Sequence, residues 1–382
     1  MPKPLAGVRV LDLTRLIPGG VCTMMLADLG ADVIKIEDPN GGDYGRWMPP
    51  LADGLSVFFR ICNRNKRSAI LDLKTPDGLA ALRRLVKHAD VLVEGFRPEV
   101  MQRLGCDYES LRAINPRLVY ASISGWGSNG PYASRSGHDL SYASLAGVVG
   151  GMKTPQVIGG QTADIGGAYV ALAGIAAGLF QAQRTGEGIH VEASLFEAAL
   201  PFVLYPWAEA LYAGLGGGQG ALTGGAACYN VYHARDGRAV SLSALEPKFW
   251  ANFCHAVERP DLIADHLLPE RQAYLRTELA ELFALRTAAE WDEHLREADC
   301  CFAVIYAPGE VANDPHIRAR GAMGIGADGL PWMRSPLRLE GDTFEPGRVP
   351  GYGEHTRLIL AEAGYDASEI EALIAIGAAR AG

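Results

Sequence analysis

Several short motifs that mark common enzyme classes are absent from this 382-residue sequence. Its seven cysteines form no CxxC pair and no cysteine–histidine cluster with zinc-ligand spacing, so we expect no metal site and cysteines that are reduced and mostly buried. No GxxxxGK[ST] segment is present, and no GxGxxG segment opens a helix after the first expected strand. P-loop nucleotidases and NAD- or FAD-binding enzymes are therefore disfavoured.

Long apolar runs and an excess of positive charge are also missing. No stretch approaches the ~18 uninterrupted apolar residues of a membrane span, the N-terminus has no apolar signal core, and the last residues are not a peroxisomal address. A formal net charge of −9 argues against a nucleic-acid surface. We therefore expect a cytoplasmic enzyme with no membrane or nucleic-acid partner.

What is present favours a large α/β protein. Short apolar runs at 8–13, 31–36, 68–73, 90–93 and 118–123 alternate with helical patterns, which predicts βαβ units and a mostly parallel sheet. Proline is expected at the first helical position at Pro76 and at Pro98, with Thr75 as a helix cap. Two long apolar helices are expected at 164–182 and 194–213, with a short strand at 189–192 between them.

A glycine-rich stretch indicates a domain boundary. Residues 214–225 contain seven glycines, a composition suited to a loop or linker. Beyond it, a strand pair around 230–245 and helices near 248–257, 271–285 and 288–297 predict a smaller α+β domain. We therefore divide the chain into a large Rossmann-like domain at 1–213, a small domain at 214–320 and a C-terminal segment at 321–382 with a final helix at 352–363.

Three blocks place an ionisable side chain beside a turn or a helix start. They are Gly137 to Asp139, Thr162 to Gly167 and Glu246 to Phe249. His138, Asp164 and Glu246 together form a candidate acid/base set that takes a proton from one side of a carbon and returns it on the other. That chemistry is epimerisation.

Each of the three has a simpler interpretation. His138 fits a polar residue hydrogen-bonded at a helix start, Asp164 fits an ordinary N-cap, and Glu246 fits the first acid of a helix that begins with proline. The glycines that follow Asp164 favour a further role, because they let a ligand approach backbone N–H groups. Those groups are candidates to hold a thioester oxygen as it becomes an enolate, worth ~3 kcal/mol per donor.

A cluster of basic residues suggests a phosphate-bearing ligand. A solvated charged face explains any one of them, but together they lie near expected strand ends and helix starts, where open α/β folds bind ligands. Coenzyme A, with its diphosphate and 3′-phosphate, requires such a surface. The residues are Arg60, Arg64, Lys66, Arg67, Lys74, Arg97 and Arg103.

At these blocks the chain resembles the type III CoA-transferase family, named for formyl-CoA and carnitinyl-CoA transferases, and within it the α-methylacyl-CoA racemase branch. The resemblance runs over nearly the whole length and includes Gly224–Ala226. It implies an interlocked homodimer whose C-terminal segment returns to the large domain. It also implies that His138 and Asp164 act as acid/base residues, that Glu246 orients the imidazole, and that no cofactor is needed beyond the coenzyme A of the substrate.

The resemblance also implies a set of CoA contacts. One position departs from the family: Asp38 stands where many members have an arginine that stacks on adenine, and a carboxylate cannot supply that stack. The implied contacts are Leu16, Leu71, Lys74, Gly95, Phe96, Arg97 and Arg103.

Three functions follow from these observations. Racemisation or epimerisation of a 2-methylacyl-CoA leads, because the three blocks occur together. A CoA-transferase, in which Asp164 forms acyl-anhydride and CoA-thioester intermediates, is the alternative favoured by the loop Gly216–Gly220, by Asp38 and by Thr223. A non-catalytic CoA-binding protein is the third. The sequence specifies neither the acyl group nor, for a transferase, the acceptor acid.

Overall fold

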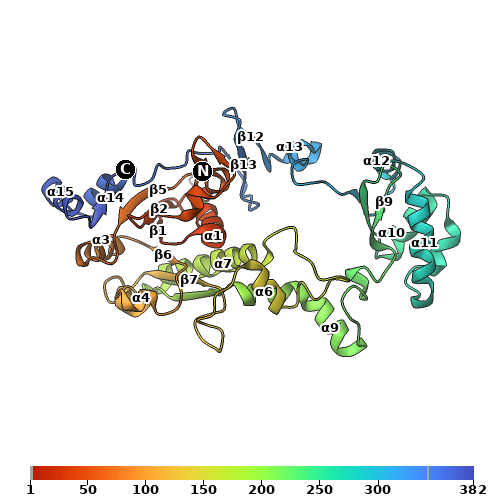
Figure 1. Cartoon of the computed structure of the whole chain (residues 1–382), viewed down its shortest axis with the longest axis horizontal. Coiled ribbons are helices and arrows are strands. Elements are labelled where there is room, and N and C mark those ends of the chain that lie inside the picture. Colours follow the sequence, from red (N-terminus) through yellow and green to blue (C-terminus); the bar gives the residue numbers. More distant parts are fainter. Residues whose placement is uncertain (1–2, 342–343) are drawn as a thin grey trace. The chain divides into compact units, whose positions relative to one another are not determined.

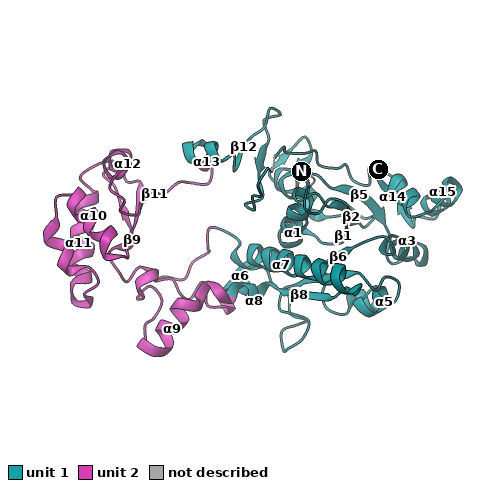
Figure 2. Cartoon of the chain, turned by 180° about the vertical axis from the view of Figure 1, so that it is seen from behind, with its two compact units in different colours: residues 1–143, 160–199, 312–382 teal, residues 144–159, 200–311 magenta. Residues whose placement is uncertain are grey.

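The computed structural model describes residues 3–341 and 344–382, and the chain divides into two compact units (Figure 1 and Figure 2). Unit 1 comprises Met1–Ala143, Gly160–Ala199 and Ala312–Gly382, and unit 2 comprises Ser144–Gly159 and Leu200–Val311. The main divisions therefore fall at 199/200 and 311/312, whereas the sequence led us to place them at 213/214 and 320/321. A short segment, 144–159, belongs to unit 2 although it precedes the long helix of unit 1.

Unit 1 is built on a seven-stranded sheet in the order β14-β5-β2-β1-β6-β7-β8. All pairings are parallel except that of β14 with β5, which brings the end of the chain into this sheet. The predicted mostly parallel α/β fold is confirmed, and each of the five expected runs contains most of a strand. The strands are β1 (Arg9–Asp12), β2 (Asp32–Glu37), β5 (Arg67–Leu71), β6 (Val91–Glu94), β7 (Val119–Ser124), β8 (His190–Ser194) and β14 (Ala379–Arg380).

Helices cover both faces of this sheet (Figure 1). Helices α3, α14 and α15 pack on one face, and α1 and α7 pack on the other. The helices of unit 1 are α1 (Leu16–Asp28), α2 (Val57–Asn63), α3 (Pro76–Val86), α4 (Val100–Arg103), α5 (Tyr108–Arg112), α6 (Asp139–Leu145, which crosses into unit 2), α7 (Thr162–Thr185), α8 (Leu195–Ala199), α13 (Pro315–Arg320), α14 (Thr356–Glu362) and α15 (Ala367–Ala375). Two short hairpins complete the unit: β3 (Leu51–Ala52) with β4 (Leu55–Ser56), and β12 (Met323–Ile325) with β13 (Pro331–Met333).

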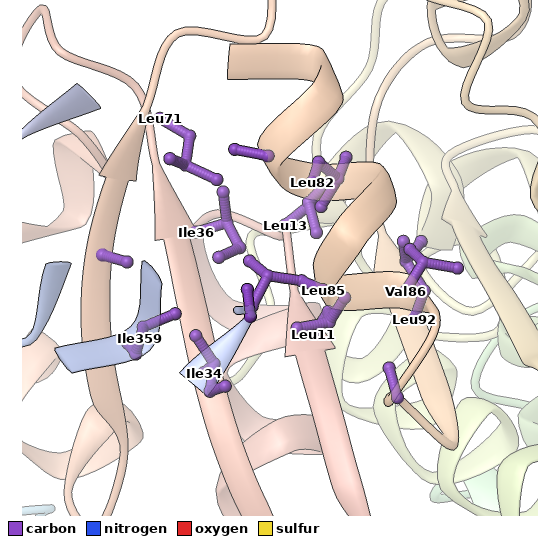
Figure 3. Packing of buried hydrophobic residues seen from close by; sticks show 14 of the residues in the cluster. Leu11, Leu13, Ile34, Ile36, Leu71, Leu82, Leu85, Val86, Leu92 and Ile359 are labelled. Atoms are coloured by element: carbon purple, nitrogen blue, oxygen red, sulfur yellow. The ribbon is translucent and has the colours of Figure 1, made fainter. Parts of the chain in front are cut away.

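The α3 face is a continuous apolar core (Figure 3). Leu11 and Ile34 from the strands and Leu82 from α3 are fully buried there, together with Ile359 from α14. Side chains in a strand alternate between faces, so the neighbours Asp12 and Lys35 point to the opposite, α1 side. The sheet therefore carries apolar residues on one face and buried charges near the strand ends on the other.

The two prolines expected at helix starts behave differently. Pro76 is the first residue of α3, and the Thr75 hydroxyl accepts a hydrogen bond from the Gly78 amide at 3.1 Å. Pro98 is not in a helix, and that prediction is wrong. Helix α4 begins two residues later at Val100, because Glu99 adopts a left-handed conformation with φ +69°.

Helix α7 is longer than expected and only partly buried. It spans 24 residues and is long and apolar enough to cross a membrane, by length and composition alone. In the structure, 33% of its most apolar window is buried. The helix packs along α1, β7 and β8, and one such helix is weak evidence for a membrane span, because the core helix of a protein passes the same test. Phe180 on its outer face is 60% exposed.

The helix predicted at 194–213 is broken. Helix α8 ends at Ala199, a 3-10 turn follows at Leu200–Val203, and α9 (Leu204–Ala213) begins in unit 2. Pro201 explains the break, because its ring clashes with the carbonyl four residues earlier and it has no N–H to donate.

Unit 2 has an antiparallel sheet in the order β11-β10-β9, which confirms the smaller α+β domain. Three helices pack on it around the buried rings of Trp250, Phe253, Phe283 and Trp291. A capping box formed by Thr287 and Glu290 begins α12. The elements of this domain are β9 (Tyr229–His233), β10 (Ala239–Ser243), α10 (Pro247–Ala256), α11 (Gln272–Phe283), α12 (Ala288–Leu295) and β11 (Phe302–Val304).

Candidate active site

The implied CoA contacts line two cavities at the carboxyl ends of the unit 1 strands, where open α/β sheets bind ligands. The first, which we call the β1–β5 cavity, has a volume of about 400 Å³. The implied CoA contacts Leu71, Lys74, Phe96 and Arg103 line it. Its walls come from the ends of β1, β2 and β5 and from α4.

The second, which we call the α6–α7 cavity, also has a volume of about 400 Å³. It brings His138 and Asp164 together with the remaining implied contacts, Leu16, Gly95 and Arg97. Phe96, Thr14 and Arg15 line both cavities, so the two are neighbours. The shared wall therefore connects the cavity that Lys74 lines with the cavity that Asp164 lines, both within unit 1.

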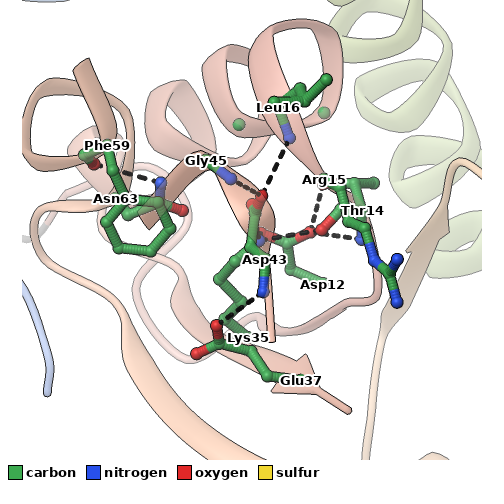
Figure 4. Close-up of polar contacts among 12 residues, drawn as sticks. Asp12, Thr14, Arg15, Leu16, Lys35, Glu37, Asp43, Gly45, Phe59 and Asn63 are labelled. Carbon is green, nitrogen blue, oxygen red and sulfur yellow. Dashed lines mark hydrogen bonds and ion pairs between the residues drawn. The ribbon is translucent and has the colours of Figure 1, made fainter. Parts of the chain in front are cut away.

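The loop Thr14–Leu16 forms the shared wall and is held by buried charges (Figure 4). Asp12 accepts hydrogen bonds from the Thr14 amide at 2.9 Å and from its hydroxyl at 2.5 Å. Lys35 donates to the Thr14 carbonyl at 2.8 Å and pairs with Asp43 at 3.0 Å. These contacts hold the loop in place. They stabilise the strained backbone of Leu16, whose φ is +58°.

The charge on Asp12 is stabilised by its neighbours. Burial alone would raise the pKa of Asp12, but the charges of Lys35 and Lys66 lower it below the usual range. Burial lowers the pKa of Lys66, and Asp12 opposes that shift. Asp12 and Lys66 are 3.1 Å apart and fully buried, so this pair belongs to the support of the loop.

The prediction that the whole basic cluster faces a ligand is wrong for four of its residues. Lys66 is buried against Asp12, and Arg64 is buried against Asp28. Arg67 pairs with Asp32 at 2.5 Å and with Glu362 at 2.8 Å, and Arg60 donates to the Ala52 carbonyl at 2.9 Å. The acidic partners of Arg64, Lys66 and Arg67 lie far away in the sequence, so the positive pattern alone gave no sign of these ion pairs. Lys74, Arg97 and Arg103 do line the cavities.

Arg15 is a cavity residue that the sequence analysis missed. Its guanidinium pairs with Asp38 at 2.5 Å and lies 6.0 Å from the centre of the Tyr44 ring. Asp38 also lines the β1–β5 cavity. Asp38, which stands where many family members have an arginine, thus holds Arg15 beside the same cavity.

His138 and Asp164 lie at the starts of two helices. His138 immediately precedes α6, and its carbonyl accepts a hydrogen bond from the Ser141 amide at 2.7 Å. Asp164 is the third residue of α7, and Gln161 occupies the N-cap position. The N-cap interpretation of Asp164 is therefore wrong, and its side chain lines the cavity instead.

The oxyanion role expected for the amides around Asp164 is not supported. Asp139 Oδ1 accepts hydrogen bonds from the Ala163 amide at 2.8 Å and from the Asp164 amide at 3.0 Å. The Ile165 amide donates to the Gln161 carbonyl at 3.0 Å, and the following glycines lie inside α7, where amides bond four residues back. Asp139 was missed because its reach across to α7 is not visible in the sequence, although it follows His138 directly.

The protonation of Asp164 reflects this setting. Burial, and then the negative charge of Asp139, raise the pKa of Asp164 to about 7. Burial and the charge of Asp164 also raise the pKa of Tyr142, whose hydroxyl donates to the Gly137 carbonyl at 2.8 Å. A carboxyl group with a pKa near neutrality is suited to take up and return a proton.

Glu246 belongs to unit 2 and is not among the residues that line the α6–α7 cavity. It occupies the N-cap position of α10, with Pro247 first in the helix, as one interpretation of the sequence expected. Its side chain makes no capping hydrogen bond and is exposed. The carboxylate is thus not used by its own helix.

Within residues 3–341 and 344–382, no group of three or more histidine, cysteine, aspartate or glutamate side chains is arranged to hold a metal ion.

A family model described as CoA-transferase family III matches residues 5–356. The chain belongs to this family. It is 33% identical to the alpha-methylacyl-CoA racemase of Homo sapiens over 376 residues, which cover 96% of this chain and 95% of the human protein. It is 34% identical to the acetyl-CoA:oxalate CoA-transferase of Acetobacter aceti over 371 residues, covering 92% of each.

Solved structures agree with the fold. A CAIB/BAIF family protein from Brucella suis superposes with a TM-score of 0.81 at 32% identity and covers 95% of this chain and 100% of its own. Because relatives of both activities match along nearly the whole chain, this is an enzyme of the family III CoA-transferase or racemase type.

Proposed function

We propose that this protein is a racemase or epimerase of 2-methylacyl-CoA thioesters. The observation that carries the proposal is that His138 and Asp164 line one cavity, from the starts of α6 and α7. One residue removes the proton from the carbon next to the thioester carbonyl, and the electron pair of that C–H bond forms an enolate. The other residue returns a proton to the opposite face of the same carbon, so no net oxidation or group transfer occurs.

The protonation state of Asp164 supports this chemistry. With a pKa of about 7, Asp164 is present at neutral pH in both the acid and the base form. A racemase needs both forms, because each base must serve as the acid in the reverse direction. A nucleophilic carboxylate needs the ionised form, which this environment disfavours.

The β1–β5 cavity is the proposed site of the CoA nucleotide. Lys74 and Arg103 on its walls offer positive charge to phosphate groups, and Arg97 does so in the neighbouring cavity. Arg15 offers a planar guanidinium to the adenine ring, in place of the arginine that Asp38 replaces. Coenzyme A enters as part of the substrate, and the reaction requires no separate cofactor.

A CoA-transferase with Asp164 as nucleophile is the second candidate. It is favoured by the similarity to the Acetobacter aceti enzyme and by the glycine loop at Gly216–Gly220. This loop is well held in unit 2: the Gly218 amide donates to the Gly151 carbonyl at 2.9 Å, and Gln219 accepts from the Gly216 amide at 2.7 Å.

The deciding experiment incubates the protein with one enantiomer of a 2-methylacyl-CoA in deuterated water, without a carboxylic acid acceptor. We expect deuterium at the α-carbon and loss of optical purity. Asp164→Asn serves as the inactive control. The proposal fails if neither change occurs, and the transferase is supported if CoA moves only when a carboxylate is added and hydroxylamine traps an acyl group at Asp164.

A further inference from the structure

One carboxylate joins the two segments that carry the proposed proton-transfer residues. Asp139 is the first residue of α6 and follows His138 in the chain. Its Oδ1 atom accepts hydrogen bonds from the amides of Ala163 and Asp164 at the start of α7, at 2.8 Å and 3.0 Å. His138 and Asp164 are thus connected by one peptide bond and one hydrogen-bonded bridge, although they are 26 positions apart in the sequence.

Helix α7 depends on this bridge for its N-terminal cap. The first amides of a helix have no partner inside the helix, and an N-cap side chain normally accepts from one of them. Gln161, at the N-cap position of α7, makes no such hydrogen bond. Asp139 supplies the missing acceptor from a different helix, so capping of α7 and placement of α6 are one interaction.

We propose that Asp139 is a positioning residue, whose carboxylate bridge sets the Asp164 carboxyl group at the correct place relative to His138 for transfer to opposite faces of the substrate carbon. This inference rests on the proposed function. Proton transfer requires the reacting groups within hydrogen-bond reach of one carbon, and a displacement of about 1 Å can reduce the rate about 10²-fold. The bridge is a short, rigid means of fixing that distance.

The same carboxylate adds negative charge near Asp164. After burial, this charge is a cause of the raised pKa of Asp164, so it adjusts protonation as well as position. The position and the charge can be separated by substitution. The other titratable or charged groups that line the α6–α7 cavity are Arg15, Tyr44, Arg97, His138 and Tyr142.

Asp139→Asn and Asp139→Ala separate the bridge from the charge. The asparagine retains Oδ1 as an acceptor for both amides but is neutral. We expect its kcat for racemisation to stay within about fivefold of wild type at its own pH optimum, and its acidic limb to move to lower pH, because Asp164 loses a nearby negative charge. The alanine loses the bridge, and we expect kcat to fall about 10- to 100-fold while KM for acyl-CoA changes less than about threefold.

Asp366→Ala is the matched control. Asp366 caps α15 in the same unit by accepting from the Glu369 amide at 2.8 Å. Its loss should lower stability, as the loss of other N-caps does, without changing kcat or the pH profile. A general effect of removing a cap is thereby distinguished from the effect of this bridge.

Amide hydrogen–deuterium exchange provides a measurement that needs no catalysis. The Ala163 and Asp164 amides should be protected in the wild type and in Asp139→Asn, and should exchange at least about tenfold faster in Asp139→Ala. If the wild type does not racemise, the proposed function fails, and this measurement still decides whether the bridge exists. Three results would each overturn the inference. The first is a wild-type kcat in Asp139→Ala, the second is an equal fall of kcat in Asp139→Ala and Asp139→Asn, and the third is rapid exchange of the Ala163 and Asp164 amides in the wild type.

Discussion

At the scale of single residues, ionisation of Asp164 opposes folding. Its pKa is about 7 in the folded protein against 3.8 for an unperturbed aspartate, so folding favours the protonated form. The stability that this group contributes is complete below about pH 4 and is lost as the pH rises through 7. Asparagine does not titrate and resembles the protonated carboxyl group. Asp164→Asn should therefore become more stable than wild type as the pH rises, by about 4 kcal/mol at pH 8, because the raised pKa then has almost its full effect.

Urea unfolding at pH 5 and pH 8 measures this difference. The exposed Asp53, whose side chain is 89% accessible, provides the control, since Asp53→Asn should show no such growth with pH. A constant difference between Asp164→Asn and wild type at the two pH values would show that Asp164 has an ordinary pKa.

His138 is expected to serve one face of the substrate carbon. His138→Ala should lower racemisation in both directions by about 10²- to 10⁴-fold, because a full turnover needs both bases. Asp164 can still remove and return a proton on its own face, so one enantiomer should take up deuterium with retention of configuration. CoA affinity should change little, because Lys74 and Arg103 line the other cavity.

Chiral chromatography and proton NMR in deuterated water follow the two processes separately. Racemisation at the wild-type rate in His138→Ala, or weakened CoA binding as the main effect, would make His138 a structural residue. A CoA-transferase that acts through Asp164 would then be the better supported of the two functions.

The residues that could be recognised from the sequence are those within distinctive local blocks. His138 and Asp164 were identified in this way, and they line one cavity. Asp139 and Arg15 were missed, because their importance lies in contacts with Asp164 and Asp38 that folding brings close. Positive charge likewise predicted a ligand surface at Arg64, Lys66 and Arg67, where folding instead forms ion pairs within unit 1.

At the scale of elements, the strands were predicted best. Parallel strands buried on both faces read as continuous apolar runs, and the sequence contains them clearly. Helix ends were less predictable, as Glu99 before α4 shows. Helix α15 and strand β14 were not predicted from the sequence. The pairing of β14 with β5 connects residues more than 300 positions apart. Local pattern carries no information on such a pairing.

The element that links fold to site is the loop Thr14–Leu16, and Lys35 tests its support. Lys35→Met removes the donor to the Thr14 carbonyl and leaves Asp43 without its lysine partner. Breaking a buried ion pair in this way should cost about 3 kcal/mol of the free energy of unfolding. The loosened loop should also weaken CoA binding by severalfold, because it lines both cavities.

Arg296→Met provides the comparison for this prediction. Arg296 forms its ion pairs with Asp292 and Glu293 at the surface, where its side chain is 55% exposed, so its loss should cost less than about 1 kcal/mol and leave CoA binding unchanged. Urea unfolding and calorimetric titration with CoA measure the two effects. Equal stability of the two variants would show that the Lys35 network does not support the loop.

At the scale of the whole molecule, large apolar side chains are exposed on both units. Phe180 on α7 is 60% exposed in unit 1, and Trp207 and Tyr212 on α9 are 60% and 92% exposed in unit 2. An apolar surface formed by several neighbouring exposed side chains, as along α9, is typical of regions of protein interaction. We propose that it is covered in a homodimer of intertwined subunits, in which Glu246 of one chain orients His138 of the other.

A mixed dimer tests that arrangement. Asp164→Ala and Glu246→Ala subunits should each be inactive alone, because each homodimer lacks one residue at both sites. If a site takes His138 and Asp164 from one chain and Glu246 from the other, a mixed dimer has one doubly altered site and one intact site. Co-expression of the two variants with different affinity tags, followed by two-step purification, should yield a dimer with roughly half of the wild-type activity. If each site is formed within one chain, both sites of the mixed dimer lack a residue, and the purified mixed dimer will be as inactive as the parents.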